Sequence, residues 1–172
     1  MKLTVLVTYA TRYGSTEEIA QALAETLRES AATVEVQPIQ KVHSPERYDA
    51  VVLGAPLYMG RLHKDARRFL SEHRSALTQI PVALFVLGPV HKDEKDWTGA
   101  RMQLEKELAK FPWFSPVAQQ IFGGKFDPAN LGFPLTLIPP LRKMKASDVR
   151  DWAAIRAWAS DLAVALQPVP HG

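Results

Sequence analysis

The sequence predicts an α/β fold, a three-layer α/β/α sandwich in which helices cover both faces of a five-stranded parallel sheet. Five short runs rich in Val, Leu and Ile recur along the chain, and longer segments with helical spacing separate them. This alternation is typical of a parallel sheet, because each crossover to the next parallel strand needs a helix-sized connection. The predicted strands are Leu3–Tyr9, Thr33–Gln37, Asp49–Ala55, Pro81–Leu87 and Val117–Phe122.

The predicted strands differ in how continuous their apolar residues are. Leu3–Tyr9, Asp49–Ala55 and Pro81–Leu87 are nearly unbroken apolar runs, which is typical of central strands buried on both faces. Thr33–Gln37 alternates apolar and polar residues, so it is expected to be a half-exposed edge strand.

Helical periodicity appears between the strands. In Ser15–Glu29, Ile19, Leu23 and Leu27 recur at four-residue steps and form one apolar stripe. Leu62–Leu77 is predicted to be the second helix. The stripe of the third helix is Leu104, Leu108 and Phe111.

The helix starts are predicted from residues able to cap them. Thr98 is expected to cap the third helix, and either Ser147 or Asp148 the last one. Trp152 and Trp158 are expected to pack into the core beneath this last helix, because its apolar residues recur at steps of three and four.

Composition limits the classes of function. The 172 residues include 21 Lys and Arg, 18 Asp and Glu and no Cys, which gives a formal net charge of +3. Without Cys, the chain cannot form disulfides, use a thiolate nucleophile or bind zinc or an iron–sulfur cluster through Cys. Residues 61–172 contain 16 basic and 11 acidic groups, so the positive charge is concentrated in the C-terminal two thirds.

A single domain is expected over residues 1–167, followed by a tail at 168–172. The stretches Phe111–Gly124 and Pro128–Leu141 lack Asp, Glu, Lys and Arg, but they are shorter than the roughly 20 apolar residues of a membrane span. No small-residue cleavage site follows the first apolar run, so a cytoplasmic location is expected. Gly123–Lys145 is too long and apolar for an ordinary connection and is interpreted as an insert.

A hydroxyl-rich turn follows the first predicted strand and leads into the first helix. It consists of Thr11, Arg12, Tyr13, Gly14, Ser15 and Thr16. Backbone N–H groups at a helix N-terminus, together with hydroxyl donors, suit a phosphate monoester. The same residues also suit a plain helix start capped by Ser15 or Thr16, and the motif alone does not separate the two.

Three better-known sites in α/β folds are excluded. The chain has no G-x-x-x-x-G-K-[ST] sequence for a nucleoside triphosphate and no G-x-G-x-x-G sequence for a Rossmann dinucleotide site. A receiver domain needs carboxylates at the ends of the first and third strands, where this chain has Thr8-Tyr9 and Gly54-Ala55.

Longer motifs follow the first and third strands: T-Y-A-T-R-Y-G-S-T and V-V-L-G-A-P-L-Y-M-G-R-L-H. With these motifs, the chain resembles the flavodoxin-like FMN-binding domain family. It is most similar to the branch of menaquinone-dependent protoporphyrinogen oxidases, also called protoporphyrinogen dehydrogenases, which has a basic apolar insert and a D-W-x-x-I sequence like Asp151–Ile155. The resemblance covers nearly the whole chain and implies the strand order 2-1-3-4-5, with FMN at the carboxyl ends of the strands.

The resemblance implies three cofactor-binding loops, of which Thr11–Thr16 would hold the phosphate. The loops on the two sides of the flavin ring would be Pro56, Leu57, Tyr58, Met59 and Gly60, and Leu87, Gly88, Pro89, Val90 and His91. Tyr58 is expected to be the flat wall beside the ring, and a partly buried surface aromatic is the alternative. His91 equally suits a solvated loop and Trp97 a staple for the next helix. No catalytic acid or base and no metal site are predicted.

Electron-carrier flavodoxins differ from this chain. They are typically acidic around the flavin and have a D-S-x-x-Y-x-x-F loop after the fourth strand, where this chain has Gly88–Asp93. The insert also differs from that of the oxidase branch, because it is Pro-rich and aliphatic before Arg142, Lys143 and Lys145. The difference in the insert argues against a porphyrinogen substrate more than against a bound flavin.

Two hypotheses of function follow. In the first, the chain is an FMN-dependent oxidoreductase that passes electrons from an organic substrate, porphyrinogen by resemblance, to a quinone. Residues 128–145 would then contact the inner face of the cell membrane peripherally, or serve as a cover or oligomer contact. The alternative is a basic flavodoxin that carries single electrons between protein partners.

Other classes have less support. An NAD(P)H-dependent quinone or nitro reductase lacks a nicotinamide-binding signature here. No nucleic-acid partner is expected, because no basic stripe interleaves with aromatic residues. The oligomeric state is left open, with a homodimer as one option.

Overall fold

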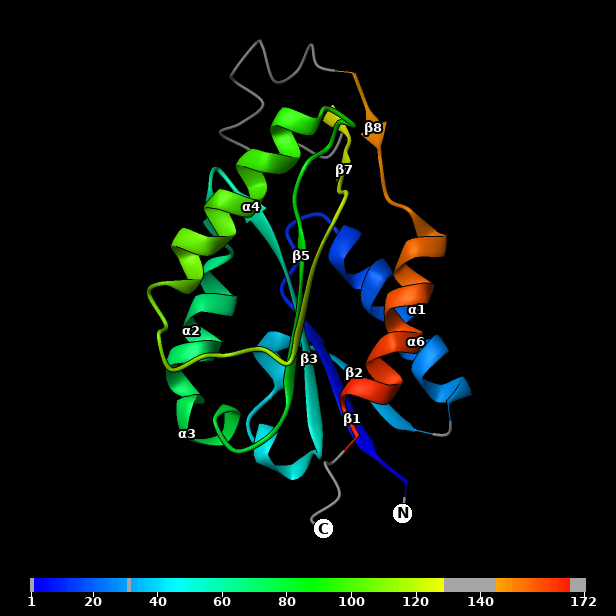
Figure 1. Ribbon diagram of the computed structural model, residues 1–172, viewed down its shortest axis with the longest axis vertical. Helices are drawn as coiled ribbons and strands as arrows, with labels where there is room; N and C mark the ends of the chain where they lie inside the picture. Colours follow the sequence, from blue (N-terminus) through cyan, green and yellow to red (C-terminus); the bar gives the residue numbers. More distant parts are fainter. Residues whose placement is uncertain (1, 31, 129–144, 168–172) are drawn as a thin grey trace.

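The computed structural model describes residues 2–30, 32–128 and 145–167, and its central sheet lies between two layers of helices (Figure 1). The strands are β1 (Thr4–Tyr9), β2 (Thr33–Pro38), β3 (Ala50–Tyr58), β4 (Arg61–Leu62), β5 (Val82–Leu87), β6 (Ala118–Phe122), β7 (Lys125–Phe126) and β8 (Ser147–Asp148). The α-helices are α1 (Ser15–Glu29), α2 (Lys64–Glu72), α3 (Arg74–Leu77), α4 (Glu94–Leu108) and α6 (Trp152–Ala165). The short 3₁₀ helices are η1 (Ile39–Lys41) and η2 (Pro45–Arg47).

The main sheet has the strand order β2-β1-β3-β5-β6, and all of these neighbours pair in parallel. Numbered as the five predicted strands, this is the order 2-1-3-4-5, so the predicted flavodoxin-like sandwich is confirmed. The two-residue strand β4 pairs with the end of β3 in antiparallel fashion. All five predicted strands are present with ends shifted by at most three residues.

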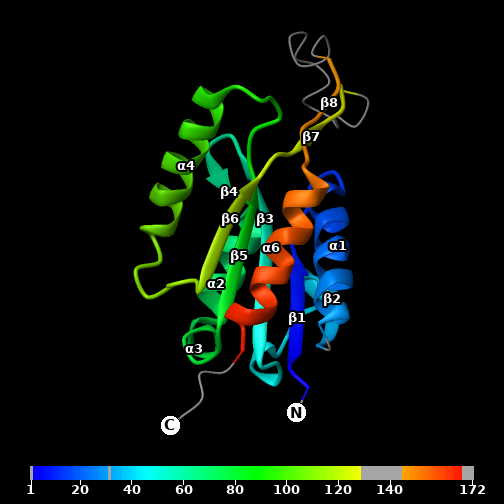
Figure 2. The same cartoon turned by 45° about the vertical axis from the view of Figure 1, so that its right-hand side comes forward.

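Helices cover the two faces of the sheet (Figures 1 and 2), and an apolar core lies on each face. On one face, Val7 of β1 packs with Leu23 of α1 and Ile155 of α6. On the other, Leu6 packs with residues of α2 and α4, such as Leu70. Successive residues of β1 serve opposite cores because side chains alternate along a strand. The central strands β1 and β5 are almost wholly buried and β2 is half-exposed, as predicted.

The second predicted helix is interrupted. Leu62 belongs to β4, and the helical segment begins at Lys64 and breaks at His73 into α2 and α3. The His63 imidazole is the N-cap, because its Nδ1 accepts the Asp65 N–H at 3.1 Å. The prediction that one helix covers 62–77 was wrong because a run of apolar spacing does not reveal a strand of two residues at its start.

The predicted caps of the last two long helices were wrong. Asp93 caps α4 by accepting the Lys95 N–H at 2.9 Å, so Thr98 lies inside that helix. Asp151 caps α6 by accepting the Ala154 N–H at 3.0 Å. In each case the sequence offers more than one residue with a suitable oxygen within a few positions, and apolar periodicity does not distinguish between them.

The aromatic residues of α6 pack as predicted. The half-buried Trp158 ring contacts Phe85 at a centroid distance of 6.3 Å and Phe122 at 5.6 Å. Trp152, also half-buried, packs against the same core. Phe111 lies beyond the end of α4 but remains buried in the opposite core.

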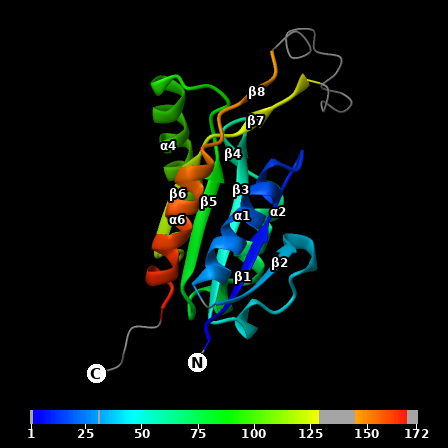
Figure 3. The same ribbon diagram turned by 90° about the vertical axis from the view of Figure 1, so that its right-hand side faces the viewer.

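The ends of the predicted insert form a ribbon of two short strands. Strands β7 and β8 pair in antiparallel fashion beyond the carboxyl end of the main sheet (Figure 3). Ser147 and Asp148, predicted to start the last helix, instead form β8. Most of the insert, residues 129–144, and the predicted tail at 168–172 lie outside the described residues. In the part of the chain that is described, no helix is long and apolar enough to cross a membrane.

Candidate functional site

A pocket of about 160 Å³ opens where the loops after β1, β3 and β5 meet. These loops follow the carboxyl ends of adjacent parallel strands, which is where α/β sheets of this type bind ligands. The pocket is lined by Thr11, Arg12, Tyr13, Ser15, Thr16, Pro56, Leu57, Tyr58, Leu87, Gly88, Val90, Gly124, Lys125 and Phe126. The structure therefore brings together residues from all three loops that the resemblance assigned to FMN.

The turn after β1 leaves the start of α1 open toward this pocket. Gly14 is the N-cap residue, has a φ of 89° and forms no side-chain cap, so the alternative in which Ser15 or Thr16 caps the helix was wrong. The Thr11 Oγ1 accepts the Gly14 N–H at 2.8 Å and braces the turn. The first helical bond runs from the Glu18 N–H to the Gly14 carbonyl, and the N–H groups of residues 15–17 precede it.

Strands β3 and β4 form a tight hairpin that carries Tyr58 to the pocket. Tyr58 pairs with Arg61 across the two turn residues. Met59 has a φ of 50° and Gly60 a φ of 76°, and two left-handed central residues are the pattern of a type I′ hairpin turn. Met59 is 83% exposed at the tip, while Tyr58 is half-buried.

The guanidinium of Arg12 covers the Tyr58 ring. Its central carbon lies 4.0 Å from the ring centroid, and its Nε donates to the Tyr13 hydroxyl at 2.9 Å. A cation held over an aromatic face contributes about 0.5–1 kcal/mol at an exposed site. Any flat ligand that stacked on this face of Tyr58 would displace Arg12 toward the turn that precedes α1.

The loop after β5 reaches the pocket with its first residues only. Leu87, Gly88 and Val90 line the pocket. The Pro89 carbonyl instead accepts the Gly124 N–H at 2.8 Å. His91 is exposed and outside the pocket lining, and its carbonyl accepts the Trp97 indole N–H at 3.3 Å. Trp97 therefore fastens this loop to α4, as the staple interpretation predicts.

Five of the predicted site residues are not among the lining residues, namely Gly14, Met59, Gly60, Pro89 and His91. Gly14, Met59 and Gly60 shape the two turns that carry lining residues. A cofactor-binding role for any of the sixteen residues stays a prediction.

Sequence reasoning missed the wall formed by Gly124, Lys125 and Phe126. These residues reach the pocket because Lys125 pairs with Asp148 and Phe126 with Ser147, some twenty residues later in the chain. No local pattern signals that pairing. The one sequence signal that could have indicated this wall was the position of the insert directly before the last helix.

Arg150 ties this wall to the first turn of α1. Its nearly buried guanidinium forms ion pairs with Glu18 and with Asp148, the latter at 2.8 Å. It also lies 4.8 Å from the centroid of the Trp152 ring. The hydrogen bonds from Arg150 lower the pKa of Asp148, and the bond to Asp148 raises the pKa of Arg150. The β7–β8 ribbon is therefore fixed relative to the turn before α1.

The charges around the pocket are unbalanced. Arg12 and Lys125 are the two charged residues among the lining residues, and no carboxylate joins them in the described part of the chain. This arrangement favours an anionic ligand. Among residues 2–30, 32–128 and 145–167, no group of three or more His, Asp or Glu side chains is placed to hold a metal ion.

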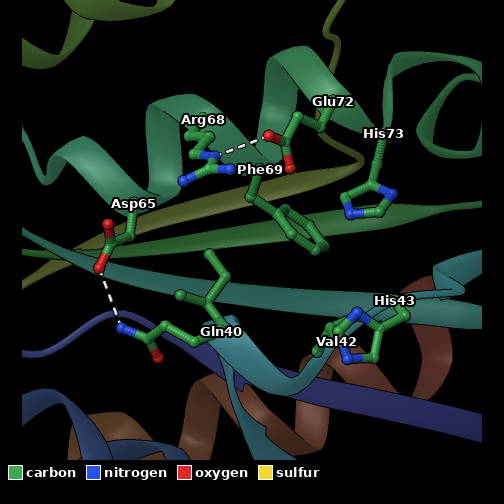
Figure 4. Close-up of a pocket in the computed structure, with 9 residues that line it drawn as sticks. Gln40, Val42, His43, Asp65, Arg68, Phe69, Glu72 and His73 are labelled. Atoms are coloured by element: carbon green, nitrogen blue, oxygen red, sulfur yellow. Dashed lines mark hydrogen bonds and ion pairs between the residues drawn. The ribbon is translucent and has the colours of Figure 1, made fainter.

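A second pocket of about 300 Å³ lies between η1 and α2 (Figure 4). Its polar groups are largely paired with one another. Gln40 donates to Asp65 at 2.9 Å, and Arg68 forms an ion pair with Glu72 at 2.6 Å. The described residues around it include none of the three strand-end loops, so the pocket at the carboxyl ends is the candidate site.

Comparisons with known proteins agree with this geometry. The flavodoxin domain family matches residues 6–146. Protoporphyrinogen IX dehydrogenase (quinone) of Escherichia coli strain K12 is 28% identical over 169 residues, which cover 92% of this chain and 93% of that protein. The Leishmania major protein of the same name is 26% identical over 96% of this chain and 77% of its own length.

A relative that matches part of the chain and a solved structure with the same fold also agree with this family. NAD(P)H dehydrogenase (quinone) of Acidovorax ebreus is 33% identical, but over only 40% of this chain and 45% of its own length. Oxidised flavodoxin 1 from Bacillus cereus superposes with a TM-score of 0.62 at 18% identity, covering 95% of this chain and 99% of that one. With the parallel sheet, the strand-end pocket and a family match over most of its length, the chain belongs to the flavodoxin domain family.

Proposed function

We propose that this chain is an FMN-dependent oxidoreductase that takes electrons from an organic substrate of the porphyrinogen type and passes them to a quinone. The observation that carries this proposal is the pocket in which the turn before α1 meets the loops after β3 and β5. Similarity over nearly the full length to protoporphyrinogen IX dehydrogenase (quinone) supports the choice of donor and acceptor.

The residues present fit the phosphate end of FMN. Gly14 is the N-cap in the left-handed conformation, and the first N–H groups of α1 have no side-chain cap. Ser15 and Thr16 line the pocket next to these groups, and the helix dipole favours an anion there. We infer that Thr11–Thr16 hold the phosphate.

The ring end of the cofactor fits the other two loops. Tyr58 offers an aromatic wall, and Leu57, Leu87 and Val90 supply apolar surface around it. Flavin enzymes leave the redox chemistry to the cofactor, and the protein binds, orients and shields it. We infer that Pro56–Gly60 and Leu87–His91 flank the ring and that Phe126 closes the third side.

The charge of the pocket rim suits a substrate with carboxylates. Arg12 and Lys125 line the pocket, and no carboxylate is among its described lining residues. A quinone acceptor would have to approach the same opening, because the main sheet closes the pocket from below. We propose that the protein is cytoplasmic, and that any peripheral contact with the inner membrane face involves residues 128–145.

We also propose that residues 1–167 form a single domain.

The alternative function is that of a one-electron carrier, and the structural similarity to flavodoxins is compatible with it. The net charge of +3 argues against the usual acidic docking face of such carriers.

The test is anaerobic oxidation of protoporphyrinogen by the FMN-loaded protein, with a soluble menaquinone analogue as acceptor and porphyrin fluorescence as the readout. Oxidation that requires both FMN and quinone is the expected result. If the FMN-loaded protein oxidises no protoporphyrinogen with any quinone tried, the substrate assignment is lost. Two one-electron potentials that are widely separated, with no quinone-dependent turnover, would favour the carrier.

A further inference from the structure

Glu107 of α4 is a buried carboxylate that the proposed chemistry does not use. Its side chain is 3% exposed, and in the described part of the chain it accepts the Leu62 N–H, at 3.1 Å from Oε2, and pairs with the Lys110 ammonium. Burying a charge is costly unless it is paired and hydrogen-bonded. The position of the two donors therefore indicates what this carboxylate does.

The backbone N–H and carbonyl of Leu62 are free to bond with groups outside the β3–β4 hairpin. The His63 N–H donates to the Pro56 carbonyl at 3.1 Å, so hydrogen-bonded pairing occurs on that side of Leu62. Antiparallel pairs alternate between hydrogen-bonded and non-hydrogen-bonded positions. The pair Leu57–Leu62 is the non-hydrogen-bonded one, and the N–H and carbonyl of Leu62 point away from β3.

Side chains from two helices satisfy both of these outward groups. Glu107 accepts the Leu62 N–H, and the Arg67 Nε of α2 donates to the Leu62 carbonyl at 3.1 Å. The Gln103 side chain of α4 lies 3.6 Å from where a side chain on Gly60 would start. Helix α4 therefore holds the hairpin at its turn and at its second strand.

Burial alone would raise the pKa of Glu107. The bonds from Lys110 and the Leu62 N–H, together with the charges of Lys110 and Arg67, more than offset it and lower the pKa. The carboxylate is therefore ionised near neutral pH and binds the Leu62 N–H as a charge-assisted acceptor, which is stronger than a neutral one.

We propose that Glu107 is a positioning residue for the flavin ring, because its bond to the Leu62 N–H fixes the β3–β4 hairpin and with it Leu57 and Tyr58 in the pocket. This inference rests on the proposed binding of FMN. Glu107 does not touch the pocket, so it acts through Leu62 and the paired residues of β3.

The test uses the full chain with two substitutions at one position. Glu107→Met removes the acceptor while keeping an unbranched side chain of similar length, and Glu107→Gln keeps an amide oxygen for the Leu62 N–H. We expect Glu107→Met to weaken FMN and riboflavin binding alike, by about fivefold to tenfold, because the effect concerns the ring end. Glu107→Gln is expected to restore most of the affinity and the visible circular dichroism of the bound flavin.

A double-mutant cycle separates positioning from general destabilisation. If Glu107 acts through Tyr58, the fold-loss of flavin affinity caused by Glu107→Met should fall toward one, meaning no effect, when Tyr58 is already replaced by Ala. Equal effects in both backgrounds, or unchanged affinity in folded Glu107→Met, would overturn the proposal. Arg68→Met is the matched control, because Arg68 pairs with the exposed Glu72 on α2 and is expected to leave affinity unchanged.

Hydrogen exchange of the Leu62 amide tests the bond between Glu107 and Leu62 without any flavin, and so independently of the proposed function. Faster exchange in ligand-free Glu107→Met than in the wild type supports the clamp, and equal exchange refutes it. If the wild type binds neither FMN nor riboflavin, the proposed function and the role in positioning flavin both fail, whatever the exchange shows. If Glu107→Met does not fold, Glu107→Gln replaces it in the exchange measurement. Its neutral oxygen is a weaker acceptor than the carboxylate, so the Leu62 amide should exchange measurably faster than in the wild type, and equal exchange would refute the clamp.

Discussion

Tyr58 is the aromatic residue that the β3–β4 hairpin brings to the pocket, and Arg12 covers its ring. Stacking a flavin there would exchange a cation–aromatic contact at 4.0 Å for contact between two flat rings. Aromatic pairs contribute about 0.5–1.5 kcal/mol beyond the area that they bury. The exchange is therefore favourable if Arg12 keeps a partner, and the phosphate near its own turn would provide one.

Tyr58→Ala tests the ring wall. We expect FMN and riboflavin to bind about tenfold more weakly, because both lose the aromatic contact, and Tyr58→Phe to bind nearly as the wild type does. Titration of flavin fluorescence measures all three proteins. Unchanged affinity in folded Tyr58→Ala would mean that the ring binds elsewhere.

Thr11→Val tests the phosphate end separately. The substitution removes the hydroxyl that accepts the Gly14 N–H at 2.8 Å and keeps the shape of the side chain. We expect FMN affinity to fall about fivefold and riboflavin affinity to stay constant, because riboflavin has no phosphate. Thr26→Val on α1, whose hydroxyl donates to the Ala22 carbonyl of the same helix, is the control. An equal loss for both flavins would contradict the assignment of this turn.

At the scale of elements, the central strands depend on one close contact between neighbours. Gly54 of β3 lies opposite Phe85 of β5, and a side chain on Gly54 would start 2.0 Å from the tip of the Phe85 ring. Phe85 is fully buried and contacts the rings of Phe122 and Trp158, so it has little room to move.

Gly54→Ala is therefore expected to lower the free energy of unfolding by about 3 kcal/mol or more, because overpacking a tight core forces side chains off their preferred rotamers. Phe85→Leu should recover part of that loss in the double variant, so that the two changes cost less together than their sum. Gly99→Ala, at a half-buried position of α4 where an added Cβ would have nothing within 4 Å, is expected to stabilise the protein slightly. Urea unfolding measures each, and strict additivity would argue against the contact.

The N-terminus of α2 should respond to pH through its cap. Burial lowers the pKa of His63, which outweighs the opposite effect of the Asp65 carboxylate at 3.8 Å. Only the neutral imidazole can accept the Asp65 N–H, so the cap is intact above the unfolded-state pKa of about 6.5. As the pH falls from there through the lower folded-state pKa, the unfolded chain binds the proton first and stability is lost.

His63→Asn checks this dependence, because Asn is an effective cap that does not titrate. Urea unfolding at pH 7.5, 6.5 and 5.5 should show a smaller loss of stability for this variant than for the wild type. His91→Asn, in an exposed loop, should retain the wild-type dependence. Parallel curves for the wild type and His63→Asn would show that the cap does not titrate in this range.

The strands and the first helix could be predicted because their information is local. The period of Ile19, Leu23 and Leu27 defined α1 to the residue, and unbroken apolar runs identified the central strands. Helix starts were predicted less well, because Asp93 and Asp151 compete with nearby oxygens and only folding selects among them. Asp148, one of the two predicted caps of the last helix, instead lies in β8 and pairs with Arg150.

For the whole molecule, the loops after β1, β3 and β5 could be predicted as neighbours because the strand order places their ends together. The wall at Gly124–Phe126 could not be predicted, since it depends on pairing between β7 and β8 across the insert. The excess of positive charge in residues 61–172 is partly at the site, in the form of Lys125. Positive charge at the site attracts an anionic substrate and repels a basic protein partner.

The central claim is that the pocket binds FMN, and the absorption spectrum of the purified protein tests it most directly. We expect the bands of oxidised flavin, either as purified or after addition of FMN, and release of FMN rather than FAD or riboflavin on denaturation. The bands should disappear on reduction and return when a quinone is added. A colourless protein that binds no added FMN would contradict the account.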